Sequence, residues 1–356
     1  MTLSGMKLND ESYEAIATIK PSASAHYTDL QRQVKKILSE SSFWERHGRD
    51  RMQVLVGYLT MGALGLLLLR SDSLPTFFAG ILALSWCHHM LVARAAHLSS
   101  HNSFGLPYYG HMALVWFIES VMCFPYDVAM DAHAKLHHPH TNIIGLGDSS
   151  SWKVPQLGRE LYLFIAPLML PLASPLIGIK ETLMVVGKDR SKWLSLIRFL
   201  SLAIVGAFWQ YWLFRNVCSM SPTCAALCVW LTRAPYYIPY IHVNIFQHIG
   251  LCMYVNENRP DRITQISTGV LNLPRNPLLD FNFGHSLISC HIEHHLFPTL
   301  SDTMCLKIQP TVRKYFKEHG LAYNERTYVN RFRFFFNDYE KLMVNAPYIT
   351  EFIGIR

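Results

Sequence analysis

His291-Ile292-Glu293-His294-His295, followed directly by Leu296-Phe297-Pro298, is the stretch around which this chain is organised. Its three histidines stand at positions i, i+3 and i+4, which share one face of a helix within about 60° of one another. Three neutral imidazoles on one turn can hold most of one metal ion. An isolated H-x2-HH is equally well explained as a chance cluster on a solvated face, so its meaning depends on the other histidines.

Two more histidine boxes precede this one. An H-x3-H box consists of His97 and His101, and an H-x3-HH box consists of His133, His137 and His138. Residues four apart share a helix face. In the second box, His138 lies roughly 140° from His133 on an ideal helix, while Pro139 ends the helix before His140. Helix geometry therefore leaves open whether His138 or His140 completes this box.

The composition is that of a membrane protein with a substantial polar part. Of the 356 residues, 50% are hydrophobic and only 16% are charged, compared with about 25% charged in soluble domains. The net charge of +7 accompanies no nucleic-acid-binding motif, so we expect basic loops on the cytoplasmic side of a membrane and no nucleic-acid partner. The eight cysteines are scattered without a C-x-x-C and indicate reduced thiols.

Uncharged or nearly uncharged runs predict four membrane spans, at about 52–69, 77–93, 193–214 and 224–241. If the boxes build one site, an even number of spans must separate each pair. The apolar segment 160–178 carries three prolines, so we assign it to a re-entrant or surface helix. Residues 108–124 carry Glu119 and are interpreted as an interfacial helix.

The predicted fold is therefore an all-α integral membrane protein. Four transmembrane helices form two hairpins, and a cytosolic helical cap holds a histidine-rich di-metal site. We assign residues 1–50 to a cytosolic N-terminal segment, 51–300 to the membrane domain with the boxes at 97–101, 133–138 and 291–295, and 301–356 to a cytosolic helical segment. Ser301-Asp302 predicts a helix start. The stretch 331–336 fits either lipid contact or a core helix under the metal site.

His248 lies shortly after the last predicted span. Together with the three boxes it supplies about nine imidazoles. One metal ion does not need nine ligands, but two ions with four or five each would use them. Zinc proteases add a carboxylate at set spacing, and H-E-x-x-H is absent. Imidazole also suits iron and copper. His88 and His89, near the end of a span, are assigned a supporting place, and His285 receives no role.

The boxes, their order between two membrane hairpins, and the sequence His-Ile-Glu-His-His-Leu-Phe-Pro resemble the membrane fatty acid desaturase family. The resemblance covers roughly residues 50–320, and the stretches Leu300–Pro310 and Ala346–Glu351 extend it over nearly the whole chain. Two departures stand out. The second box has three residues before its histidine pair where many relatives have two, and the third begins with His291 where front-end desaturases carry glutamine.

The resemblance implies a di-iron centre. By correspondence with the family, the ligands would be His97, His101, His133, His137, His138, His248, His291, His294 and His295, with Asn244 reaching one iron through water. It also implies an acyl-lipid substrate, either CoA-linked or lipid-linked, and O2 as co-substrate. We find no His-Pro-Gly-Gly haem signature, and so expect a separate electron donor, cytochrome b5 with its reductase, at the endoplasmic reticulum and an active site on the cytosolic side.

Three alternatives remain at this stage. A di-iron lipid hydroxylase shares the first hydrogen abstraction with a desaturase. A non-catalytic lipid-binding relative could keep the boxes without turnover. A metal transporter is disfavoured, because its polar groups would lie within the spans, whereas these histidines lie mostly outside them. Acyl-chain length, double-bond position, the acyl carrier and the oligomeric state are not encoded in any pattern that we recognise.

Overall fold

The structure is a computed structural model that describes residues 23–143, 146 and 157–343. Residues 1–22 of the predicted N-terminal segment lie outside the described residues. So does the C-terminal end from residue 344, which includes the similarity at Ala346–Glu351. The described residues form helices and no strand, with two isolated β-bridges. The predicted all-α class is confirmed.

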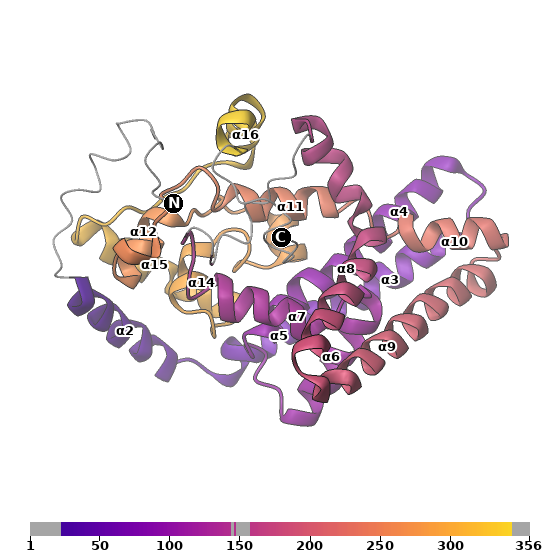
Figure 1. Ribbon diagram of the computed structural model, residues 1–356, viewed down its shortest axis with the longest axis horizontal. Coiled ribbons are helices and arrows are strands. Elements are labelled where there is room, and N and C mark those ends of the chain that lie inside the picture. The colour runs from indigo at the N-terminus through magenta and orange to yellow at the C-terminus, as the bar shows by residue number, and fades with distance from the viewer. Residues whose placement is uncertain (1–22, 144–145, 147–156, 344–356) are drawn as a thin grey trace.

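The first two long helices form a hairpin. Helix α3 (Arg49–Leu68) and helix α4 (Leu74–His89) are joined by a short turn and pack along each other (Figure 1). Pro75 lies in the first turn of α4, where a proline ring costs no hydrogen bond. A π-helical turn over Met90–Ala95 carries the chain from α4 into α5 (Ala96–Ser100). Leu59 and Leu67 are more than half exposed, as expected of side chains facing lipid.

The middle of the chain supplies the remaining apolar helices. Their bounds are α6 (Tyr108–Met122), α7 (Tyr126–Met130), α8 (Ala166–Lys188), α9 (Trp193–Trp212), α10 (Pro222–Leu231) and α11 (Tyr237–Phe246). By length and composition, the stretches that could cross a membrane are 44–68, 74–100, 161–188 and 190–217, and a fifth is added if the 100° bend between α6 and α7 joins one span. The chain is thus a multi-pass membrane protein.

Two sequence-based assignments need correction. The predicted span 224–241 is not one helix, because residues 232–236 break it into α10 and α11, each of 10 residues. The three prolines of segment 160–178 favoured a re-entrant or surface helix over a membrane span. The segment instead belongs to an apolar helical stretch of 28 residues that is long enough to cross a membrane. Pro167 lies at the helix start, and neighbouring helices can compensate for the interior prolines of α8. In Figure 1, α8 runs across the direction of α3 and α9.

The two-hairpin arrangement survives these corrections. The turn after α9 lies against the turn of the first hairpin, since Cys218 Sγ is 3.6 Å from the Leu66 carbonyl oxygen. Leu69, Ile81 and Phe214 share one buried cluster at this end. From there α10 and α11 return to His248. Both hairpin ends therefore lie together, on the side of the molecule opposite the histidine boxes (Figure 1).

The buried carboxylate of Glu119 on α6 has a cationic partner. Arg198 on α9 lies 3.3 Å from Glu119 and 2.8 Å from Asp127. The charge of Glu119 is thus compensated within the helical bundle by a cation from a neighbouring helix.

The remaining helices form a cap around the third histidine box. They are α2 (Ala23–Ser39), α12 (Arg262–Gly269), α13 (Pro277–Phe283), α14 (His291–Leu296), α15 (Asp302–Glu318) and α16 (Tyr328–Met343). The predicted helix start at Ser301 is confirmed, since its Oγ accepts from the Met304 amide. Helix α16 packs on α11 with Phe335 fully buried, so the stretch 331–336 belongs to a core helix.

Close packing of α6 against α9 depends on Gly206. A Cβ atom placed there would lie 1.9 Å from the Ser120 carbonyl oxygen, a backbone atom that cannot turn away. We expect Gly206→Ala to lower stability by roughly 1 to 3 kcal/mol through overpacking. Gly187→Ala on α8 is the matched control, because nothing lies within 4 Å of its Cβ position. Thermal unfolding of both variants in detergent checks this, and equal melting temperatures would contradict the packing argument.

Candidate metal centre

All three boxes and His248 converge on one place in the fold. The first box lies on α5 and the residue after it, the second on a π-helical turn over Asp131–His137 and the residue after it, and the third on α14. Their imidazoles separate into two neighbouring clusters. The five-histidine cluster contains His97, His101, His133, His138 and His294, and the four-histidine cluster contains His137, His248, His291 and His295. All nine predicted histidines are accounted for.

Within the five-histidine cluster the potential ligand atoms lie within 4.8 Å of one another. His294 is central to it. Its Nε2 atom is 2.8 Å from His97 Nε2 and 3.0 Å from His138 Nε2. His138 Nε2 in turn lies 3.2 Å from His133 Nε2. Helices from the membrane hairpin, the second box and the cap therefore meet at one point.

The four-histidine cluster is built in the same way. His137, His248 and His295 offer ligand atoms within 4.8 Å of one another. His291 joins them, with its Nε2 atom 2.8 Å from His248 Nε2 and 3.2 Å from His295 Nε2. The two clusters adjoin, because the neighbouring residues His294 and His295 serve different clusters.

The wide turn of the second box explains how it serves both clusters. The His138 amide donates to the His133 carbonyl at 3.1 Å, an i→i+5 bond that defines a π-helix. The wider turn brings His138 closer to the direction of His133 than an α-helix would, and the two histidines lie in one cluster while His137 lies in the other. Of the two residues left open by the sequence, His138 lies in the five-histidine cluster and His140 does not. His140 Nδ1 lies 3.3 Å from the Arg259 guanidinium instead.

The third box is held in place by its own apolar residues. Ile292 and Leu296 are buried in the core formed by α2, α12, α14 and α15. The opposite side of α14 carries the histidines. The Asn272 side chain accepts from the Ile292 amide and donates to the Glu293 carboxylate, which also accepts from Tyr323. Glu293 therefore anchors α14 to the cap rather than facing the clusters.

Burial keeps these imidazoles neutral. Eight of the nine histidines are buried, and His133 is partly buried. Desolvation lowers the pKa of His101 to about 4 and that of His291 to about 3. The pKa values of His294 and His295 are also lowered well below the usual range, first by burial and then by the neighbouring imidazoles. Neutral imidazole is the form that binds a metal ion.

The donor set fits metal ions. Two metal–imidazole bonds of about 2.1 Å, the length found for zinc, place their nitrogens about 3 Å apart when they meet at a right angle. The observed separations between Nε2 atoms are 2.8 to 3.2 Å. Nitrogen donors without thiolate or carboxylate favour iron, copper or zinc over magnesium or calcium. Each cluster has enough imidazoles for one ion.

The other histidines that were considered lie outside the clusters. Asn244 donates from Nδ2 to the Tyr240 carbonyl at 2.7 Å. His88 and His89 are buried in α4 beside Tyr237, away from both clusters. His285 contacts the Asp280 carboxylate at 3.2 Å. The water-mediated role of Asn244 therefore rests on the family resemblance alone.

A buried arginine that the sequence analysis did not single out lies behind the first box. Arg94 is 1% exposed, and its guanidinium lies 2.7 Å from Asp302 and 3.1 Å from Asp50. It also donates to Gln53 and to the Phe281 carbonyl. The charge is thus fully satisfied, and it ties α3 and α4 to the start of α15. Arg94 directly follows the predicted span 77–93, and a charged residue at that position was the signal in the sequence that could have marked it.

A second arginine joins two boxes directly. Arg262 of α12 donates to the carbonyl oxygen of His138 at 2.6 Å and to that of His295. These carbonyls belong to the second and third boxes and to different clusters. Burial lowers the pKa of Arg262 to about 10, so it remains a cation at neutral pH. No spacing pattern in the sequence marks this residue.

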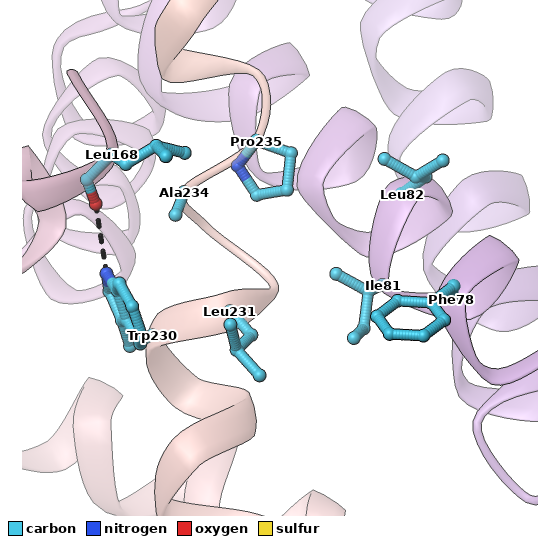
Figure 2. Close-up of a pocket in the computed structure, with 8 residues that line it drawn as sticks. All are labelled: Phe78, Ile81, Leu82, Leu168, Trp230, Leu231, Ala234 and Pro235. Atoms are coloured by element: carbon cyan, nitrogen blue, oxygen red, sulfur yellow. Dashed lines mark hydrogen bonds between the residues drawn. The ribbon is translucent and has the colours of Figure 1, made fainter. Parts of the chain in front are cut away.

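An apolar cavity of about 260 Å³ lies farther along the membrane helices (Figure 2). Phe78, Ile81 and Leu82 of α4 face Leu231 and Pro235 across it. Leu82 precedes His97 by 15 residues, which is about 20 Å along a helix. The cavity is therefore too distant from the clusters to hold reacting carbons. Phe78 and Leu82 are half exposed on the lipid-facing surface.

Comparison with known proteins agrees with this site. The model of the fatty acid desaturase family matches residues 73–327, which include all three boxes. The chain belongs to this family. It is 43% identical over 336 residues to fatty acid desaturase 6 of Mus musculus, covering 94% of this chain and 96% of that protein. The Bos taurus protein of that name is 44% identical over 94% of this chain and 96% of its own length. The Homo sapiens protein is 43% identical, with 92% and 90% covered.

Proposed function

We propose that this chain is a membrane acyl-lipid desaturase that uses O2 and two iron ions. The observation that carries the proposal is the pair of adjoining clusters with nine imidazoles between them. Membership of the fatty acid desaturase family supports it. In the overall reaction, –CH2–CH2– and O2, with two electrons and two protons, give –CH=CH– and two water molecules.

We assign the ligands by cluster. His97, His101, His133, His138 and His294 would hold one iron, and His137, His248, His291 and His295 the other, with Asn244 reaching an iron through water. When bound, the iron ions supply the activation of O2 needed to remove hydrogen from an unreactive methylene group. The chain itself supplies position. The imidazoles come from helices packed into one buried core, so little reorganisation is needed on substrate binding.

The substrate, donor and location follow from the family resemblance. The substrate is a fatty acyl chain carried on CoA or on a lipid. Two electrons come from a separate donor, cytochrome b5 with its reductase, and the protein resides in the endoplasmic reticulum membrane. In Figure 1, α5 and α14, which carry the first and third boxes, lie toward the other end of the first hairpin from its turn. The basic residues Arg46, Arg49 and Arg51 lie at the start of the first hairpin on the cluster side, which supports a cytosolic site.

Lipid analysis of yeast that expresses this chain tests the proposal. We expect a new unsaturated acyl species that is absent from cells expressing His294→Ala, because His294 contacts two other histidines of the five-histidine cluster. The position of the new double bond would define the regiochemistry. A new hydroxylated lipid would instead establish the hydroxylase reaction. If folded, iron-loaded protein supplied with acyl-CoA and lipid substrates, cytochrome b5 and its reductase formed no product, the lipid-binding alternative would replace the proposal.

A further inference from the structure

Two hydroxyl groups lie directly behind the clusters, one behind each. Ser286 Oγ is 3.2 Å from His97 Nδ1, on the side of the ring away from the five-histidine cluster. Thr141 Oγ1 is 3.0 Å from His295 Nδ1, behind the four-histidine cluster. Both hydroxyls are buried, with Ser286 1% and Thr141 0% exposed. A hydroxyl can either donate or accept, so its other contacts decide which form of the histidine it stabilises.

The hydroxyl of Ser286 donates its proton to a group other than His97. Oγ donates to Asp302 Oδ1 at 2.5 Å, and the same carboxylate faces Arg94 at 2.7 Å. The ion pair keeps Asp302 an acceptor. Ser286 Oγ must then accept from His97 Nδ1–H, which leaves the lone pair of His97 on Nε2. That atom is the one that faces His294 in the cluster.

The hydroxyl of Thr141 is committed in the same way. Oγ1 lies 3.0 Å from the carbonyl oxygens of His137 and His138, which can only accept. Its remaining lone pair accepts from His295 Nδ1–H, so the lone pair of His295 is on Nε2. The Thr141 backbone is itself fixed, because Gln265 donates to its carbonyl at 2.6 Å.

The backbone of Ser286 fixes the tautomer of a third imidazole. Its carbonyl accepts from His291 Nδ1 at 2.9 Å, so His291 also presents a lone pair on Nε2. His291 and His295 then direct two lone pairs at each other across 3.2 Å. Neither nitrogen can donate, and burial keeps both rings uncharged. A cation bound to both nitrogens removes this repulsion.

We propose that Ser286 and Thr141 are positioning residues that fix the metal-binding tautomers of His97 and His295, one for each ion. This inference rests on the proposed metal centre. Partners on the far side of metal-bound histidines typically contribute 10- to 100-fold to metal affinity. Each hydroxyl therefore controls the occupancy of its own cluster, and Ser286 also links the first box to the third through its side chain and backbone.

Metal content of the purified full-length protein tests this. We expect about two iron ions per chain in the wild type. Thr141→Val keeps the shape of the side chain but removes the hydroxyl. It should lower the affinity for one of the two ions 10- to 100-fold, as measured by competition with a chelator. Thr141→Ser restores the hydroxyl and should restore binding. Ser286→Ala should lower the affinity for the other ion, and the double variant should lower the affinity for both ions.

Two buried hydroxyls away from the clusters serve as controls. Thr182 Oγ1 donates to the Gly178 carbonyl within α8, and Ser267 Oγ donates to the Thr264 carbonyl within α12. Thr182→Val and Ser267→Ala should keep both ions. The ligand-field spectrum of the Co²⁺-substituted protein provides a second readout, and it should change in Thr141→Val and Ser286→Ala only.

The outcomes separate the inference from the proposed function. A wild-type protein that binds no metal would overturn the metal centre itself. A wild type with two ions, together with Thr141→Val and Ser286→Ala variants that keep both ions and an unchanged Co²⁺ spectrum, would overturn the positioning role alone. Equal losses in Thr141→Val and Thr141→Ser would also contradict it, because the serine variant retains the hydroxyl.

Discussion

Replacing His138 with alanine is expected to abolish product formation, whereas replacing His140 should leave it close to the wild-type level. His138 Nε2 lies 3.0 Å from His294 and 3.2 Å from His133, within the five-histidine cluster. Loss of a direct ligand should cost at least the roughly 100-fold in metal affinity that supporting residues can contribute. His140 is separated from the cluster and contacts the Arg259 guanidinium instead.

The pair is informative because the two residues are two positions apart and chemically identical. Both variants should be compared for unsaturated product in yeast and for iron per chain after purification. We expect near-complete loss of product and less than the full iron content in His138→Ala only. Equal activity of the two variants would place the second box differently from the π-helical arrangement described above.

We expect the replacement of Arg94 with alanine to destabilise the whole protein. The change leaves Asp50 and Asp302 buried without their cation, and both are fully buried. Removing one partner of a buried ion pair costs roughly 3 to 5 kcal/mol. A lysine at this position would keep the charge but not the branched guanidinium that reaches both carboxylates. We therefore expect Arg94→Lys to restore only part of the stability.

Arg32→Ala provides the matched control. Arg32 also pairs with an aspartate, Asp29, at 3.2 Å, but its side chain is 77% exposed. Exposed ion pairs contribute little, so this variant should melt like the wild type. The measurement is thermal unfolding of the detergent-solubilised protein. If Arg94→Ala melted at the same temperature as Arg32→Ala, the buried network would not be a structural link between hairpin and cap.

The histidine clusters were largely predictable because their histidines recur at helical spacing. All nine histidines that were singled out lie in the two clusters. The choice between His138 and His140 was not predictable, since it depends on an i→i+5 turn that standard helix periodicity does not contain. Ser286, Thr141 and Arg262 were also missed. Each acts through one or two hydrogen bonds to residues far away in the sequence, and no local pattern records such contacts.

The membrane helices show a different limit of sequence reasoning. The first hairpin was predictable, because two uncharged runs are separated by a short polar turn. The break at 232–236 contains Arg233 and Pro235, two local signals that the average hydropathy of the run outweighed in the prediction of one span. In α8 the prolines suggested an interruption, yet the helix continues through Pro171 and Pro175. Proline alone therefore does not decide where a membrane helix ends, because neighbouring helices can compensate for it.

Asp50, Arg94 and Asp302 lie far apart in the sequence, and their order determines when their contacts can form during synthesis of the chain. At 5 to 20 residues per second, a ribosome needs roughly 10 to 40 s to proceed from the first histidine box to residue 302. During that interval Arg94 lacks one of its two carboxylates, and His97 lacks the serine behind it. The nascent hairpin therefore waits in the membrane with its first box incomplete. The proposed metal centre is complete only after the third box has been synthesised, and cells that degrade unassembled hairpins would act on this protein before that point.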